Sequence, residues 1–220
     1  MSSGSKTYLQ HHFANKEQQY ESAKLGMWAF LVTEVLTFAG LFCAYAILRS
    51  KFPDTFELCS QLLNTNLGLI NTIVLITSSL TMALAIYYIQ NDNRKQTIIM
   101  LALTIIFAAV FMIIKYFEYS HKFHLGEFTA KYFSSDLIPA ISKGGEVTNP
   151  GAYFSIYFMM TGLHGVHVIG GIVVISVMML NTYKGKYSSE YYTPIEVTGL
   201  FWHLVDLVWI FLFPLLYLIG

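Results

Sequence analysis

Residues 25–48 read LGMWAFLVTEVLTFAGLFCAYAIL, an apolar run of 24 residues in which Glu34 is the only charged side chain. At about 1.5 Å per residue, a helix of this length crosses the hydrocarbon core of a bilayer. A carboxyl group at that depth is costly and rare, and it is a candidate functional residue by default. The run therefore predicts a transmembrane helix with one polar site inside it.

The rest of the chain has the composition of an integral membrane protein. Of its 220 residues, 55% are hydrophobic and 12% are charged, whereas soluble domains carry about 25% charged residues. The apolar runs are continuous rather than alternating, which argues against a transmembrane β-barrel. We therefore expect an all-α membrane protein with a polar N-terminal segment, 1–24, and a single five-helix domain, 25–220. The expected spans are 25–48, 67–89, 97–117, 153–180 and 197–219.

An odd number of spans places the two termini on opposite sides of the membrane. With the N-terminus inside, the inner segments carry seven Lys and Arg residues and the outer segments carry five. Because Lys and Arg are enriched in cytoplasmic loops, we expect the N-terminus and segment 1–24 inside and the C-terminus outside.

Small residues form a stripe beside Glu34 on the first expected helix, which would let another helix approach closely. They are Gly26, Thr33, Thr37, Gly40 and Ala44. We therefore expect Glu34 to face protein rather than lipid. We also expect it to be protonated at neutral pH, because a low dielectric disfavours the ionised form.

Other polar side chains lie within or at the ends of the expected spans, several of them three residues apart and so on one helix face. They are His164 and His167 in the fourth span, His203 and Asp206 in the fifth, and Glu118 with His121 after the third. A metal or haem site is one interpretation, but a di-iron bundle needs two Glu-x-x-His pairs, and only Glu118 begins one. A proton or ion pathway through Glu34 and Asp206 is another, although two acids do not make a continuous relay. We favour hydrogen bonding between helices for the histidines.

Five segments, one in or at the end of each span, resemble subunit III of the haem–copper respiratory oxidases. They are LVTEVLTF (31–38), NTIVL (71–75), FEY (117–119), TGLHGVHVIG (161–170) and FWHLVDLVW (201–209). They occur in the order of the family, and the resemblance covers about residues 21–220. The usual form has seven helices. This chain lacks the first two and resembles the five-helix bacterial form.

The resemblance implies an accessory subunit that binds no haem or copper and has no catalytic or metal-ligating residue of its own. Haem and copper would lie in the catalytic subunit I and in subunit II, in a bacterial cytoplasmic membrane. Membership of a larger supercomplex stays open. The family's intramembrane carboxylate, which reacts with carbodiimide in some members, corresponds to Glu34. Its paired histidines correspond to His164 and His167, and its last-helix pair to His203 and Asp206.

The resemblance also implies a function. The whole oxidase would reduce O2 to water and pump protons, while this chain would stabilise the catalytic subunit, hold phospholipid and support proton uptake. The TEVL context of Glu34 and the LINTIVL segment (69–75) resemble the cytochrome c oxidase branch. Cytochrome c is therefore the expected electron donor. A quinol oxidase subunit is the alternative, and a stand-alone proton or ion transporter is a third. Long cationic and Trp side chains near span ends contact lipid head groups, so we expect lipid contacts at Lys24, Trp28 and Lys184.

Overall fold

The computed structural model describes residues 9–10, 13–124 and 150–218. Its helices are α1 (Lys16–Lys51), α2 (Pro53–Ser60), α3 (Thr65–Gln90), α4 (Arg94–His124), α6 (Pro150–Tyr183) and α7 (Thr193–Tyr217). Within the described residues, five of them, all but α2, are long and apolar enough to cross a membrane. The five expected spans are confirmed, and most of the helices continue past them into polar residues.

Local sequence signals set the helix ends. The side chain of Asn15 accepts a hydrogen bond from the Gln18 amide, so α1 begins at Lys16 and part of the expected polar segment is helical. Such a cap satisfies one of the free amides of the first turn. The helix ends at Lys51, and its C-cap residue Phe52 directly precedes Pro53. Proline disfavours helical backbone in the residue that precedes it. Pro53 then opens the short helix α2, a position that suits its fixed φ.

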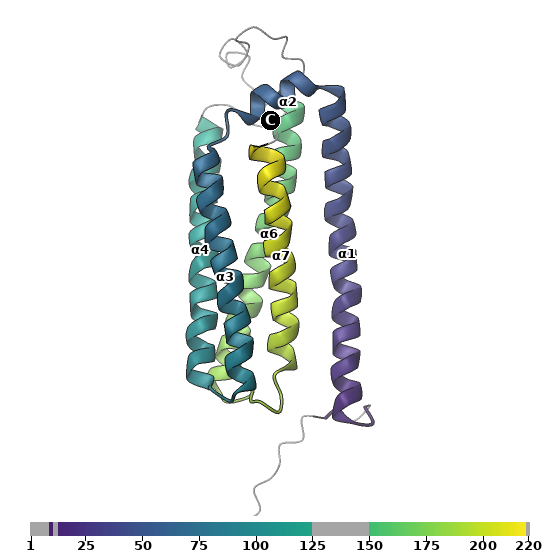
Figure 1. Cartoon of the computed structure of the whole chain (residues 1–220), viewed down its shortest axis with the longest axis vertical. Coiled ribbons are helices and arrows are strands. Elements are labelled where there is room, and N and C mark those ends of the chain that lie inside the picture. The colour runs from purple at the N-terminus through teal and green to yellow at the C-terminus, as the bar shows by residue number, and fades with distance from the viewer. Residues whose placement is uncertain (1–8, 11–12, 125–149, 219–220) are drawn as a thin grey trace, which may run out of the picture.

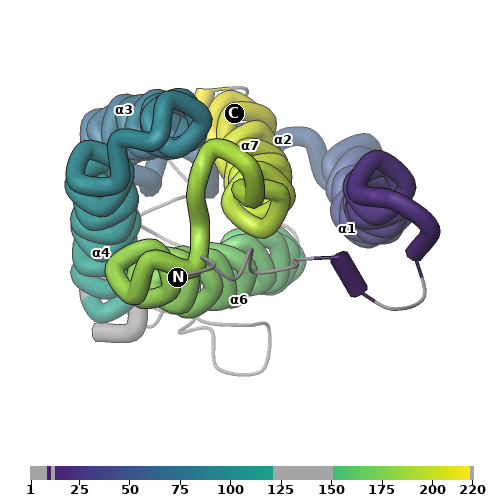
Figure 2. Tube along the Cα trace, turned by 90° about the horizontal axis from the view of Figure 1, so that it is seen from below, coloured from purple at the N-terminus to yellow at the C-terminus, as the bar shows by residue number. Residues whose placement is uncertain are grey.

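Four helices form a bundle, and α1 stands beside it (Figure 1). Figure 2 shows α3 and α4 side by side, with α7 next to α3 and with α6 next to both α4 and α7. The main contacts of α1 are with α7, α6 and α2. In the most apolar window of α1, 17% of the residues are buried, against 50% in α7. The helix α7 is therefore central to the bundle, and α1 is the most exposed of the five long helices.

Two tryptophans of α7 form the centre of the core. Trp202 and Trp209 are fully buried. Their indole N–H groups donate to hydroxyl groups of α3, Trp202 to Ser78 and Trp209 to Thr72, each over 3.1 Å. A Cβ atom added at Gly171 of α6 would lie 2.4 Å from the Trp202 ring. Glycine at this position therefore allows α6 to pack directly on the indole.

Polar contacts connect α1 to the bundle near each end and midway. The Tyr20 hydroxyl donates to the Glu196 carboxylate over 3.0 Å, and the Tyr45 hydroxyl donates to the Leu215 carbonyl over 2.7 Å. The contact midway involves Glu34. At its two glycines the stripe of small residues is not packed within this chain, because a Cβ atom at Gly26 or Gly40 would meet nothing within 4 Å. Ala44, at the other end of the stripe, packs against the core. The expected close approach is therefore absent at Gly26 and Gly40.

The helix α1 begins at the end of the molecule opposite to the end at which α7 finishes (Figure 1). The placement of the two termini on opposite sides of the membrane stays a prediction. Which end faces the cytoplasm stays a prediction from the distribution of Lys and Arg.

Candidate functional site

Glu34 faces protein, as expected, and its partner is His167 of α6. The carboxyl Oε2 lies 2.7 Å from the imidazole Nε2. The two side chains are 18% and 16% exposed, and the Phe38 ring packs against His167 with ring centres 5.3 Å apart. The pair is therefore shielded on one side by an aromatic ring, and it joins α1 to the bundle in the middle of the membrane span.

The second nitrogen of His167 determines where the protons of this pair lie. Its Nδ1 is 2.8 Å from the Leu163 carbonyl oxygen of the same helix. A carbonyl oxygen only accepts hydrogen bonds, so Nδ1 must carry a proton. One further proton then lies between Nε2 and Oε2, either on the carboxyl group or on the imidazole. The pair has no net charge in either arrangement, which lowers the cost of placing it in a membrane.

His164 lies in a different environment from His167, although the two are three residues apart. It is fully buried, and its ring packs against Phe111 of α4 and Trp209 of α7, with ring centres 5.5 and 5.3 Å apart. Neither of its ring nitrogens has a hydrogen-bond partner among the described residues. The expected hydrogen-bonded bridge between helices therefore does not form at His164, whose contacts with neighbouring helices are aromatic.

His203 and Asp206 face α3 together. His203 Nδ1 is hydrogen-bonded to the Ser79 hydroxyl over 2.7 Å, so the expected bridge to a neighbouring helix is present at this residue. Asp206 is 3% exposed, and neither of its carboxyl oxygens has a hydrogen-bond partner among the described residues. Asp206 is therefore not hydrogen-bonded to another helix by ordinary geometry among the described residues, although Ser79 of α3 lies close to it.

Glu118 is paired with Lys115, three residues before it. The Lys115 ammonium group lies 2.9 Å from Glu118 Oε2. It also donates to the hydroxyl groups of Tyr217 and Tyr157 over 2.8 and 3.3 Å, and both hydroxyls in turn donate to Glu118 Oε1. The side chain of His121 lies outside the described residues. Glu118 therefore belongs to a closed ionic cluster of α4, α6 and α7.

The sequence contained part of the signal for this cluster. Lys115 is the only Lys or Arg in the third expected span, and Glu118 follows at i+3, a spacing that brings side chains together on a helix. The Lys115 ammonium also lies 4.8 Å from the centre of the Trp209 ring. The two tyrosines come from other helices, at separations of 42 and 102 residues from Lys115. No local spacing could have identified them.

The three expected lipid contacts differ in how accessible they are. Trp28 is 57% exposed and Lys184 is exposed, as a head-group contact requires. Lys24 is partly engaged within the chain, because its ammonium group lies 2.9 Å from the Tyr20 hydroxyl and 3.5 Å from Glu196. Lys24 therefore contributes to the contact between α1 and α7.

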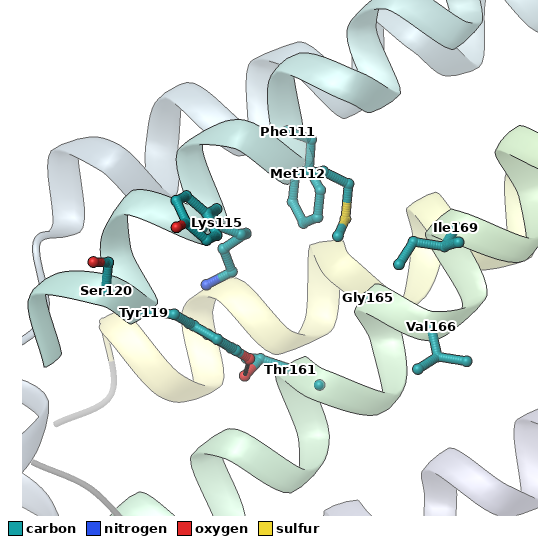
Figure 3. Close-up of a pocket in the computed structure, with 11 residues that line it drawn as sticks. Phe111, Met112, Lys115, Tyr119, Ser120, Thr161, Gly165, Val166 and Ile169 are labelled. Carbon is teal, nitrogen blue, oxygen red and sulfur yellow. Dashed lines mark hydrogen bonds between the residues drawn. The ribbon is translucent and has the colours of Figure 1, made fainter. Parts of the chain in front are cut away.

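A groove of about 440 Å³ runs between α4 and α6 on the surface of the bundle (Figure 3). Met112, Val166 and Ile169 give it an apolar lining, and Gly165 leaves its floor open. Its polar end is formed by Lys115, Tyr119, Ser120 and Thr161. There the Tyr119 and Thr161 hydroxyls are hydrogen-bonded to each other. The groove thus combines a long apolar wall with a polar end.

Metal ligands are not gathered anywhere in the described part of the chain. Within it, no three His, Cys, Asp or Glu side chains lie close enough together to hold a metal ion. The histidines that the sequence suggested for this purpose have aromatic, hydroxyl or carboxyl neighbours instead.

Comparison with known proteins covers almost the whole chain. The family model described as cytochrome c oxidase subunit III matches residues 4–220. A probable quinol oxidase subunit 3 of Staphylococcus saprophyticus is 30% identical over 197 residues, which are 90% of this chain and 89% of the relative. The probable quinol oxidase subunit 3 of Staphylococcus aureus strain USA300 is 29% identical over 207 residues, 94% of this chain and 93% of the relative.

Proposed function

The chain belongs to the cytochrome c oxidase subunit III family, and we propose that it serves its oxidase as an accessory subunit without a redox centre. It is a multi-pass protein of the bacterial cytoplasmic membrane and a subunit of a haem–copper oxidase complex. Haem and copper would be held by the catalytic subunit I and by subunit II. This chain would stabilise the catalytic subunit, hold phospholipid and support proton uptake.

The observation that supports this role is the use of ionisable groups to connect helices. Glu34 with His167 joins α1 to α6, and Lys115 with Glu118 joins α4 to tyrosines of α6 and α7. Paired groups of this kind hold a helical scaffold together, because an unpaired charge in a membrane is expensive. A continuous proton relay would instead need such groups in series across the membrane.

Copurification tests the accessory role directly. An affinity tag on this chain should recover a haem-containing catalytic subunit from mild detergent, together with oxygen-consuming activity. A chain recovered in good yield without haem or partner subunits would support the stand-alone transporter instead.

The electron donor is open to two specific proposals. The relatives in staphylococci are named quinol oxidase subunits, which favours a quinol. The residue in the first span is Glu34 in a TEVL context, which favours cytochrome c by the resemblance described above. Oxygen uptake by the purified complex distinguishes the two donors. Activity with a reduced quinol as the only electron source would support a quinol oxidase, and activity with reduced cytochrome c alone would support a cytochrome c oxidase.

We propose that the groove between α4 and α6 holds one phospholipid acyl chain. The groove is open to the bilayer and lined mainly by apolar side chains, and its polar end at Tyr119 and Ser120 lies near the end of α4. Replacement of Gly165 by Trp should fill the groove and remove one lipid from the complex, as counted by native mass spectrometry. Trp in place of Gly26, where there is also open space, provides the matched control and should retain it.

The sidedness of the membrane helices can be tested at two exposed positions. We propose that the end of the molecule with Lys184 faces the cytoplasm and the end with Ser50 faces outward. In a variant without Cys43 and Cys59, a membrane-impermeant maleimide should label Ser50→Cys in intact cells. It should label Lys184→Cys only after the cells are opened. The reverse result would place the N-terminus outside.

A further inference from the structure

The unpaired carboxyl group of Asp206 lies in a hollow on the outside of the bundle. The hollow measures about 410 Å³ and lies between α3 and α7. Its polar lining residues are Asp206, His203 and Ser79. Its apolar lining residues are Ile76, Leu80, Ala83, Leu207 and Ile210. Asp206 itself is 3% exposed, whereas Leu80 is 59% and Leu207 is 49% exposed. A buried acid thus sits at the base of a surface that is open in this chain.

Groups of this chain leave Asp206 at least partly unsatisfied. The Ser79 hydroxyl lies close enough to interact with Asp206 and is also hydrogen-bonded to His203. It can offer one donor at most, and neither Asp206 oxygen has a hydrogen-bond partner of ordinary geometry among the described residues. A buried carboxyl group without hydrogen bonds is destabilising whether it is ionised or neutral. The arrangement therefore favours a further hydrogen-bond donor from outside the chain.

Depth in the membrane determines what can supply that donor. Asp206 lies 13 residues after the first residue of α7 and 11 before the last, which is about 17–20 Å from either end of the helix. Lipid head groups remain at the membrane interface, so they do not reach this depth. Acyl chains reach it but carry no donor. A side chain on a neighbouring transmembrane helix does reach it, and helices in membranes associate through hydrogen bonds of this kind.

We propose that this surface, defined by Ser79, Leu80, His203, Asp206 and Leu207, is the docking face for a transmembrane helix of the catalytic subunit. That helix would place one hydrogen-bond donor side chain against Asp206. The proposal rests on the membership of this chain in an oxidase complex. The groove between α4 and α6 fits a protein partner less well, because its polar groups at Lys115, Tyr119 and Thr161 already have partners within the chain.

Site-directed photo-crosslinking in the intact complex tests the docking face without disturbing Asp206. The photoreactive residue p-benzoylphenylalanine is placed at Leu207, with Val173 of α6 as a control that is also exposed, at 58%. We expect a light-dependent adduct of this chain with the catalytic subunit from Leu207 and none from Val173. Mass spectrometry of the adduct should identify a helix that carries a donor side chain. Three results would overturn the proposal: adducts from Val173 alone, adducts with another subunit, or labelling of lipid alone. The accessory role would still stand in that case if this chain copurified with haem.

Substitution of Asp206 provides the energetic test. Interhelical hydrogen bonds in membranes contribute about 0.6–1.7 kcal/mol, so Asp206→Leu should weaken retention of this chain by the complex about three- to twentyfold. Asp206→Asn keeps an acceptor oxygen and should have a smaller effect, and haem content per catalytic subunit should not change in either variant. Ser176→Ala is the control, because that hydroxyl donates to Ile172 of its own helix. Equal retention of wild type and Asp206→Leu would count against a donor at this site.

Discussion

The contact between Glu34 and His167 connects helices through a shared proton, and its substitutions have different expected effects. Gln at position 34 still offers a donor to His167 Nε2, since its amide N–H can replace the carboxyl O–H. Leu offers none and leaves the nitrogen unpaired. Interhelical hydrogen bonds in membranes contribute about 0.6 kcal/mol on average. We therefore expect Glu34→Gln to keep the normal amount of this chain per haem in the purified complex and Glu34→Leu to reduce it. Equal loss in both variants would mean that the carboxyl group has a role beyond this hydrogen bond.

The position of the shared proton is a separate prediction. We expect a protonated Glu34 and a neutral His167, because two neutral groups lose less hydration in a membrane than an ion pair does. The infrared difference spectrum between wild type and Glu34→Gln at pH 7 should contain the carbonyl stretch of a protonated carboxyl group. Carboxylate bands accompanied by imidazolium bands would contradict this expectation.

Lys115 and Glu118 are expected to depend on each other. Removal of one member of a buried ion pair leaves an uncompensated charge and costs about 3–5 kcal/mol, whereas apolar replacement of both is often close to neutral. Lys115→Met and Glu118→Leu should each lower the thermal stability of this chain in the complex, and the double variant should regain much of the loss. Thermal inactivation followed by quantification of the retained chain measures the effect. Additive losses would indicate that the pair is not coupled.

At the scale of whole elements, the packing of α6 on α7 depends on Gly171. Ala at this position would place a Cβ atom 2.4 Å from the ring of Trp202, which is fully buried and has little room to move. Overpacking of this kind costs about 1–3 kcal/mol. The neighbouring Gly170 has nothing within 4 Å, so Gly170→Ala should be neutral or slightly stabilising through its helix propensity. Melting temperatures of the two variant complexes test the difference, and similar values would show that Trp202 can shift.

The long helices were predictable from the sequence, because a membrane restricts the backbone to a few structures. Every backbone group in lipid must be hydrogen-bonded, so long continuous apolar runs predict helices, and all five were confirmed. The short helix α2 was missed because the segment PDTFELCS has eight residues, too few to show a clear period. The contact of Glu34 with protein was predictable from its cost in lipid. The choice of His167 over His164 as partner was not, since it depends on where α1 stands beside the bundle.

The whole molecule consists of a four-helix bundle with α1 connected to it at three levels (Figure 1). Along its length, α1 exposes Leu25, Val32, Leu36 and Ile47, each more than half exposed. Such a surface is compatible with lipid or with another subunit. The sequence could not predict this arrangement, because packing between helices depends on contacts that are distant in the chain, such as that of Tyr45 with Leu215.

Removal of this chain from the oxidase separates a supporting role from a catalytic one. Since the accessory role places haem and copper in the partner subunits, the visible haem spectrum of the depleted enzyme should be nearly unchanged. Electron entry should also continue. The exposed flank of the catalytic subunit should instead take up protons more slowly, so that reactive oxygen intermediates persist and damage the active site. We expect oxygen uptake to start at a near-normal rate at low pH, to be slower at alkaline pH, and to decline over fewer turnovers than in the intact enzyme. Immediate loss of activity at every pH, together with altered haem bands, would rule out the accessory role.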